Sequence, residues 1–171
     1  MSSDERTQDI EPGVILVDTR EQAPLKFGPQ WRTELATLSI GDYGLKGFSD
    51  WDNPQFIIER KALGDLISSL THGRERFWRE LLKMRRYTFA AVVIEAIPGE
   101  IEMGEYQSAA KPQSILQSLA AIQVRMGVHI IWAGSHDGAA RAIERLARQY
   151  LRGINKTAMR LNIQAQTTEG E

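Results

Sequence analysis

The chain contains no cysteine among its 171 residues. This absence excludes a disulfide framework, a thiolate zinc ribbon and catalysis by a thiol, and it is compatible with a reducing compartment. No apolar run approaches the roughly 18 residues of a membrane-spanning helix, and the first twelve residues are polar and acidic, unlike a secretory signal. With 42% hydrophobic residues the chain can bury one sizeable core. We expect a single cytoplasmic, intracellular domain without a membrane partner.

Histidine clusters are lacking too. The three histidines, His72, His129 and His136, have no metal-ligand spacing between them. We expect them at the surface or in turns and not as ligands.

An excess of positive charge is also missing, since 21 lysines and arginines stand against 22 aspartates and glutamates, for a net charge of −1. Proteins that bind nucleic acid tend to be basic, but the distribution of charge matters more than its sum. Asp4, Glu5, Asp9, Glu169 and Glu171 lie near the two ends of the chain, and five more acids belong to the candidate site below. The remainder is basic and is densest between residues 74 and 86, at Arg74, Arg76, Arg79, Lys83, Arg85 and Arg86.

That basic segment also carries Phe77, Leu81 and Met84 at near-helical spacing, which predicts a helix with these residues on its core face. Its arginines form either a solvated face or a set of phosphate contacts. Arginine suits forked recognition of phosphate oxygens, and Arg76 is the strongest single candidate. The predicted DNA-binding residues are Arg20, Arg74, Arg76 and Arg79.

Apolar periodicity predicts six strands and four helices. The strands are expected near residues 13–18, 34–38, 42–46, 56–60, 90–95 and 128–133. The helices are expected near 62–70, 74–86, 112–126 and 136–152, with a loop at 98–111. Strands that come first, followed by alternating helices and strands, indicate an α/β sandwich around a mixed sheet. The segments 1–12 and 153–171 lack apolar periodicity and are expected to be flexible tails around a domain at 13–152.

The segment from Gly41 to Asp65 carries the strongest chemical signal. Gly41-Asp42 is followed by the apolar run at 56–58 and then by Glu59-Arg60-Lys61. Strand side chains alternate, so Glu59 and Lys61 share a face while Arg60 points away. Hydrolysis of a phosphodiester needs a hard cation to neutralise developing charge, and Mg²⁺ prefers one or two carboxylates with open positions for water and phosphate. Asp42 and Glu59 can supply that pair, with Lys61 close to the attacking water or the phosphate.

Further acids come from an upstream strand. The apolar run at 14–17 ends in Asp18, with Glu21 three residues later, and carboxylates at a strand end lie at the rim of a sheet, where sites are commonly built. Clustered carboxylates raise each other's pKa unless a cation reverses the effect. A cluster of Asp18, Glu21, Asp42, Glu59 and Asp65 would therefore imply a metal.

Each of these residues also has an ordinary structural interpretation. Asp65 can cap a helix or face its dipole, and Asp18 and Glu21 can be turn residues after a strand. Arg60 can pair with a structural carboxylate instead of touching substrate. Glu-x-Lys after a distant Asp occurs often by chance, so only the complete pattern is specific.

That complete pattern resembles the nuclease domain of the XPF, Mus-type and Hef structure-specific endonucleases. The family motif is Gly-Asp, a spacer, Glu-Arg-Lys, three residues and Asp, and here it stands as Gly41-Asp42, Glu59-Arg60-Lys61 and Asp65. Upstream, Asp18 followed by Arg20-Glu21 is similar to the family's first motif. The similarity continues downstream through an arginine-rich helix and an apolar strand, and covers about residues 13–150.

The resemblance implies a restriction-endonuclease-like fold, a three-layer sandwich with a central mixed sheet between helices. It implies Mg²⁺ or Mn²⁺ dependence and incision of branched, flap or junction DNA, in repair or recombination. Asp18, Asp42 and Glu59 would bind the metal and Lys61 would position or activate water. The residues that would complete the catalytic site are Glu21, Arg60 and Asp65.

The resemblance also implies pairing through the C-terminal half, so we expect a homodimer, and a helicase or another replication or recombination partner is possible. Two features differ from the family pattern. The residues after Tyr150 are too few for the tandem helix-hairpin-helix module that usually follows, and the family's Arg, three residues, Gln is matched here by Arg76 and Glu80. The alternatives to a nuclease of this family are a noncatalytic DNA-binding scaffold and a restriction-type or recombination nuclease of the same fold.

Overall fold

A six-stranded mixed sheet forms the centre of the computed structural model, which describes residues 13–168, with side chains to residue 158. The strand order is β2-β1-β3-β4-β5-β6. β1 is parallel to β2 and antiparallel to β3, β3 is antiparallel to β4, and β4, β5 and β6 run parallel. The strands are β1 (Val14–Asp18), β2 (Arg32–Ala36), β3 (Tyr43–Leu45), β4 (Phe56–Lys61), β5 (Phe89–Ile94) and β6 (His129–Trp132).

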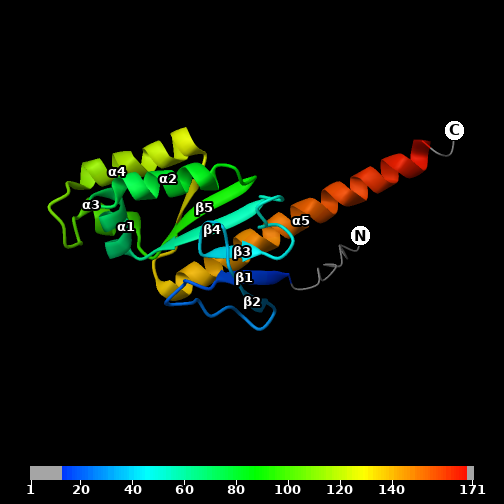
Figure 1. Cartoon of the computed structure of the whole chain (residues 1–171), viewed down its shortest axis with the longest axis horizontal. Coiled ribbons are helices and arrows are strands. Elements are labelled where there is room, and N and C mark those ends of the chain that lie inside the picture. Colours follow the sequence, from blue (N-terminus) through cyan, green and yellow to red (C-terminus); the bar gives the residue numbers. More distant parts are fainter. Residues whose placement is uncertain (1–12, 169–171) are drawn as a thin grey trace, which may run out of the picture.

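Helices cover both faces of the sheet. Figure 1 shows α1 to α4 gathered on one side, while α5 runs along the other side and continues beyond the body of the protein. The predicted three-layer α/β sandwich is therefore confirmed. The helices are α1 (Leu63–Leu70), α2 (Arg74–Met84), α3 (Pro98–Glu102), α4 (Pro112–Ala121) with the π-helical turn η1 (Ile122–Met126), and α5 (His136–Thr168).

The two faces of the sheet bury separate cores. Ile57 of β4 belongs to the core shared with Phe77 of α2 and Leu119 of α4. Its neighbour Ile58 points to the opposite core, where it lies with Ile143 of α5. A strand that is buried on both faces reads as a continuous apolar run, and this is why β4 and β5 were predictable within one residue of their observed ends.

The helices after residue 112 differ from prediction at their ends. The helix expected at 112–126 turns π-helical after Ala121 and ends at Gly127, whose φ of 65° is left-handed, as is common for a glycine after a helix. The helix expected to end near residue 152 continues to Thr168. Residues 153–168, which were expected to be a flexible tail, are thus helical. The N-terminal tail prediction at 1–12 and the last residues, 169–171, lie outside the described part of the chain.

The expected loop at 98–111 begins with a short helix. Pro98 occupies the first helical position of α3, and the Glu100 carboxylate accepts a hydrogen bond of 2.7 Å from the Ile97 backbone N–H. Five residues are too few to produce an apolar periodicity, so this helix was not predictable from the pattern. Across residues 13–168, no helix has both the length and the apolar character needed to cross a bilayer.

Gly138, near the start of α5, is required by close backbone packing. A Cβ at this position would lie 1.9 Å from the Ala133 carbonyl oxygen, a distance that only a backbone shift could relieve. Gly153, later in the same helix, has no atom within 4 Å of its ideal Cβ. Replacing Gly153 tests helix propensity alone, whereas replacing Gly138 tests propensity together with the packing contact.

We predict that Gly138→Ala lowers the free energy of unfolding by about 1–3 kcal/mol, because the clash outweighs the better helix propensity of alanine. Gly153→Ala should instead raise it by up to about 1 kcal/mol. Urea unfolding followed by circular dichroism measures both. Equal effects of the same sign would show that the Ala133 contact does not constrain α5.

Candidate active site

Glu59 and Lys61 lie on the same face of β4, as strand alternation predicts. Ile57, two residues earlier, points into the core beneath α2 and α4, so Glu59 and Lys61 extend this face toward the end of the strand. The Lys61 Nζ lies 2.7 Å from Glu59 Oε1, and 5.1 Å from the centre of the Phe77 ring of α2. Both side chains are nearly buried, with 11% of Glu59 and 14% of Lys61 exposed.

Asp42 is held against β4 by backbone hydrogen bonds. Its N–H donates to the Ile58 carbonyl at 2.8 Å, and its Oδ2 accepts from the Arg60 N–H at 2.7 Å. Gly41 makes the approach possible, because its φ is +75° and a Cβ there would meet the Ile58 carbonyl oxygen at 2.9 Å. In the Gly-Asp pair of the motif, Gly41 thus allows the close approach to β4, and Asp42 places a carboxylate beside Glu59.

The electrostatics of this group show a surplus of negative charge. Burial and the nearby charge of Glu59 raise the pKa of Asp42 to about 7. Burial also raises the pKa of Glu59, and Lys61 only partly offsets the effect. Burial alone would lower the pKa of Lys61, but the surrounding carboxylates, Glu59 foremost, raise it above its usual value. One buried ammonium does not balance the acids around it.

Asp18 is engaged in a different set of contacts. Its Oδ1 accepts from Arg20 Nε at 2.7 Å and from the Arg20 N–H at 2.9 Å, and its Oδ2 accepts from the Leu38 N–H at 2.8 Å. Burial alone would raise the pKa of Asp18, but the hydrogen bonds from Arg20 and Leu38 lower it below its usual range. Arg20 also donates to the Leu38 carbonyl at 2.7 Å, so this pair joins the end of β1 to the chain after β2.

Arg60 lies on the opposite face of β4, as expected, and pairs with structural carboxylates. Its Nη2 lies 2.8 Å from Glu21 Oε1, and its Nη1 lies 3.0 Å from Oε1 of Glu95, which directly follows β5. Burial would raise the pKa of Glu21, but the Arg60 guanidinium holds it below its usual value. Glu95 in turn lies 2.6 Å from His136 Nδ1 at the start of α5. This chain of contacts connects β4, β5 and α5.

The remaining predicted residues lie at the surface. Asp65 is exposed in the first turn of α1, where a carboxylate faces the positive end of the helix dipole. Arg79 is exposed on α2, and 74% of the Arg76 side chain is exposed, with its Nε 3.7 Å from Glu80. Glu80 also raises the pKa of Glu59 and Lys61, which places this acid within electrostatic reach of the site.

The acids of the predicted cluster engage different partners, although the charge of Glu21 contributes to the raised pKa values of both Asp42 and Glu59. Within residues 13–168, no group of three acidic or histidine side chains is arranged to hold a metal ion. Asp18 does not complete such a group because Arg20 and Leu38 engage both its oxygens. Asp42 and Glu59 do fit a hard divalent cation, since a half-buried and a buried carboxylate with raised pKa values are stabilised by positive charge. A metal-binding role for Asp18 stays a prediction.

Sequence reasoning missed the Glu95–His136 contact. Glu95 directly follows the buried run of β5, the same signal that singled out Asp18 after β1, and so it was detectable. His136 was expected at the surface or in a turn, and 44% of its side chain is exposed. No local pattern pairs it with Glu95, because the two residues meet only through packing of α5 on the sheet.

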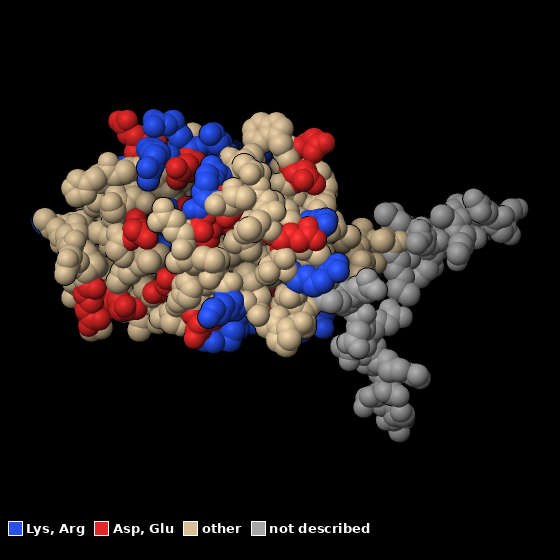
Figure 2. Space-filling model, turned by 60° about the horizontal axis from the view of Figure 1, so that its bottom comes forward, with Lys and Arg blue, Asp and Glu red and all other residues tan. Residues whose placement is uncertain are grey.

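The surface charge agrees with the nearly neutral composition. Figure 2 shows one face of the protein, on which basic and acidic side chains form separate small groups and no continuous basic strip covers the described residues. Contacts to an anionic polymer on this face would therefore depend on individual basic side chains.

Comparison with known proteins places these features in a family. The profile of the ERCC4 domain matches residues 17–146 of the chain, which include Asp18, Asp42, Glu59 and Lys61. The chain is also 28% identical over 144 residues to the DNA repair endonuclease XPF of Cricetulus griseus, a match that covers 78% of this chain and 14% of the hamster protein.

The structure resembles that of XPF from Aeropyrum pernix, with a TM-score of 0.63 and 24% identity over 80% of this chain and 60% of the archaeal one. The same archaeal protein solved in complex with DNA gives a TM-score of 0.63 at 23% identity, covering 82% of this chain and 66% of that chain. These likenesses show the restriction-endonuclease-like fold that the sequence predicted. The chain spans less than two thirds of the length of each of these relatives.

The Arg60 ion pairs allow a stability prediction. Arg60→Met would leave the carboxylates of Glu21 and Glu95 buried without their partner, so the free energy of unfolding should fall by about 3–5 kcal/mol. The matched control is Lys46→Met, which breaks the exposed pair with Glu34, whose side chains are 59% and 44% exposed, and should cost less than about 1 kcal/mol. Urea unfolding at pH 7 compares them. Equal losses would contradict a structural role for Arg60.

The raised pKa of Asp42 predicts a pH dependence. Between its unfolded pKa near 4 and its folded pKa of about 7, the folded protein binds more protons, so rising pH lowers the stability. Asp42→Asn keeps an oxygen for the Arg60 N–H and removes this loss. In chelator, the variant should match wild type near pH 4 and be more stable near pH 8, on the order of 2–4 kcal/mol. Asp65→Asn is the exposed control, and identical pH profiles of wild type and Asp42→Asn would refute the assignment.

Proposed function

Because the chain belongs to the ERCC4 domain family, we propose that it is a metal-dependent DNA endonuclease. The observation that carries the proposal is the half-buried Asp42 beside the buried Glu59 on one face of the sheet, with Lys61 at 2.7 Å from Glu59. A purely structural core gains nothing from two poorly hydrated carboxylates with one ammonium, so the arrangement favours a role in charge neutralisation.

Asp42 and Glu59 are the proposed ligands of Mg²⁺ or Mn²⁺. Such a cation, when bound, would neutralise charge on the phosphate oxygens and lower the pKa of a bound water. The two carboxylates contribute the hard oxygen donors, and their burial makes the loss of a proton costly until positive charge is present. Asp18 is proposed as a further ligand only if its carboxylate leaves Arg20.

Lys61 acts as a positive charge in this proposal and not as a base. Its raised pKa keeps it protonated at neutral pH, so its Nζ can donate hydrogen bonds but cannot accept a proton. The Phe77 ring and Glu59 hold the ammonium in place. It can therefore orient an attacking water or stabilise a phosphate oxygen as charge develops there.

Glu21, Arg60 and Asp65 complete the proposed site in supporting roles. Arg60 and Glu21 hold β4 from its far face, which keeps the Arg60 N–H aimed at Asp42. Asp65, the last residue of the motif, lies in the first turn of α1. The proposed DNA contacts are Arg20, Arg74, Arg76 and Arg79. All four are exposed, and the last three lie on α2.

The substrate and partners are proposed from the relatives. The hamster relative is named a DNA repair endonuclease, and an archaeal relative was solved with DNA. We propose branched, flap or single-strand/duplex junction DNA as substrate in repair or recombination, a homodimer as the working form, and a helicase or replication protein as a possible partner. A noncatalytic scaffold is the alternative that the following experiment separates.

Cleavage assays test the proposal directly. Labelled flap, fork, single-stranded and duplex DNA are incubated with wild type, Asp42→Asn and Lys61→Met in Mg²⁺, Mn²⁺ or chelator. We expect metal-dependent cutting that each substitution lowers at least about a hundredfold, equivalent to about 2.7 kcal/mol in the barrier. Lys46→Met, at an exposed surface pair, is the control that should keep activity.

A second readout follows the metal without cleavage. Mn²⁺ should raise the thermal unfolding midpoint of wild type, and Asp42→Asn should lose this shift, because a ligand that binds only the folded state stabilises it. A folded wild type that binds DNA but shows neither the shift nor cutting would reject the enzyme in favour of a scaffold.

A further inference from the structure

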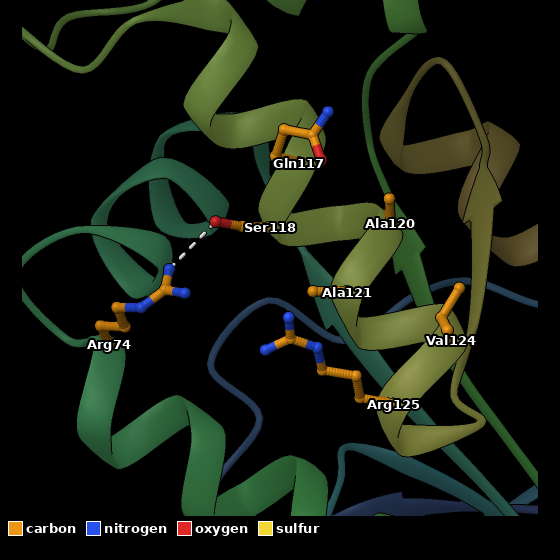
Figure 3. A pocket seen from close by; sticks show the side chains of 7 residues that line it. All are labelled: Arg74, Gln117, Ser118, Ala120, Ala121, Val124 and Arg125. Carbon is orange, nitrogen blue, oxygen red and sulfur yellow. Dashed lines mark hydrogen bonds between the residues drawn. The ribbon is translucent and has the colours of Figure 1, made fainter.

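A pocket of about 390 Å³ lies on the side of the sheet that α1 to α4 cover. It is between the start of α2 and the helix formed by α4 and η1. Arg74 of α2 lines one wall and Arg125 of η1 lines the other. Figure 3 shows both guanidinium groups pointing toward the hollow between them. The pocket is open to solvent on one side, so it suits a group presented by a larger molecule more than an enclosed small ligand.

Arg74 is held in position before any ligand arrives. Its Nη1 donates to Ser118 Oγ at 3.0 Å and lies 3.4 Å from the Leu70 carbonyl, and its guanidinium stacks 4.7 Å from the centre of the Trp78 ring. These contacts are to neutral groups, so the positive charge of Arg74 is not cancelled. An arginine fixed in this way loses little side-chain freedom when it binds an anion.

The other residues that line the pocket leave room for an anion. Ala120 and Ala121 have short side chains, and Gln117 and Ser118 supply neutral polar groups. None of the lining residues is acidic. Two arginines without an opposing carboxylate favour a doubly coordinated oxyanion, and the non-bridging oxygens of a phosphate match their forked donors.

We propose that this pocket binds a backbone phosphate of the DNA, at a position away from the bond that is cut. The inference rests on the proposed function, because α2 contributes a residue to the pocket and another to the candidate active site. Arg74 lies three residues before Phe77, which supports Lys61, a separation of about 4.5 Å along the helix axis. A strand held at Arg74 and Arg125 would therefore be positioned relative to the active site, as phosphate contacts do in general.

Arg125 is the residue to change first, because no hydrogen bond or ion pair in the described part of the chain depends on it. Fluorescence anisotropy of labelled DNA in chelator gives the affinity as a function of salt. For Arg125→Ala we expect severalfold weaker binding on every sequence and a salt slope that falls by about one unit, since one phosphate contact is lost. Arg74→Ala should have the same effect, and Arg32→Ala, which removes an exposed arginine from β2, should not.

An unchanged salt slope in Arg125→Ala would overturn the proposal, provided that circular dichroism shows the variant to be folded. Titration with inorganic phosphate, followed by NMR of the arginine Nε–H groups, separates the two sources of the anion. Phosphate binding that depends on Arg125, with an unchanged DNA slope, would assign the pocket to a free anion. A change in sedimentation with an unchanged slope would assign it to contact between two copies, and either result rejects the DNA phosphate.

Failure of the proposed function remains distinguishable, because the binding assay contains no metal and needs no cleavage. If the slope changes as expected but wild type cuts no DNA, the pocket stands and the enzyme is rejected. If wild type cuts DNA and the slope does not change, the enzyme stands and the pocket is rejected.

Discussion

The antiparallel pairing of β3 with β4 is the constraint on which the candidate site depends. The hydrogen bond from the Asp42 N–H to the Ile58 carbonyl, and that from the Arg60 N–H to Asp42 Oδ2, fix one carboxylate against the strand that carries Glu59. Gly41 permits the close approach. Once these bonds form, the two acids cannot separate without breaking the sheet. Burial raises the pKa of both carboxyls, and the nearby charge of Glu59 adds to the rise at Asp42.

The far face of β4 carries paired charges. Arg60 pairs with Glu21 and Glu95, and Glu95 contacts His136 at the start of α5. The two faces of β4 therefore differ in charge. The face with Glu59 has an excess of negative charge, and the face with Arg60 has a nearly buried cluster of ion pairs. Buried ion pairs contribute little to net stability compared with an apolar core, but they specify geometry, and here that geometry aims the Arg60 N–H at Asp42.

A net charge of −1 is unusual for the DNA-binding role proposed above, and the placement of the charges explains how it can suffice. Part of the acidic charge is internal, in Asp18, Glu59 and the Arg60 cluster, where it is buried and paired. Exposed arginines such as Arg76 and Arg79 lie on α2, whose Phe77 supports Lys61. Charge that is placed locally beside a site steers an anionic ligand even where the whole molecule is almost neutral.

Local sequence patterns predict much of the secondary structure of this protein. The apolar runs located the six strands to within about two residues, and strand alternation correctly put Glu59 and Lys61 on one face and Arg60 on the other. Periodicity failed where a helix was too short, as in α3, and where a helix continued past the residues that pack on the sheet, as α5 does after Leu151.

The order of elements, the motif and the face of each motif residue follow from neighbours along the chain, so they could be predicted from the sequence. The partners of the charged side chains depend on tertiary packing and could not. Asp18 accepts a hydrogen bond from the Leu38 N–H, Glu95 meets His136, and Arg125 comes opposite Arg74. Such pairings depend on how strands and helices pack across distances of 18 residues or more, and no local pattern encodes the free energy of burying one charge beside another.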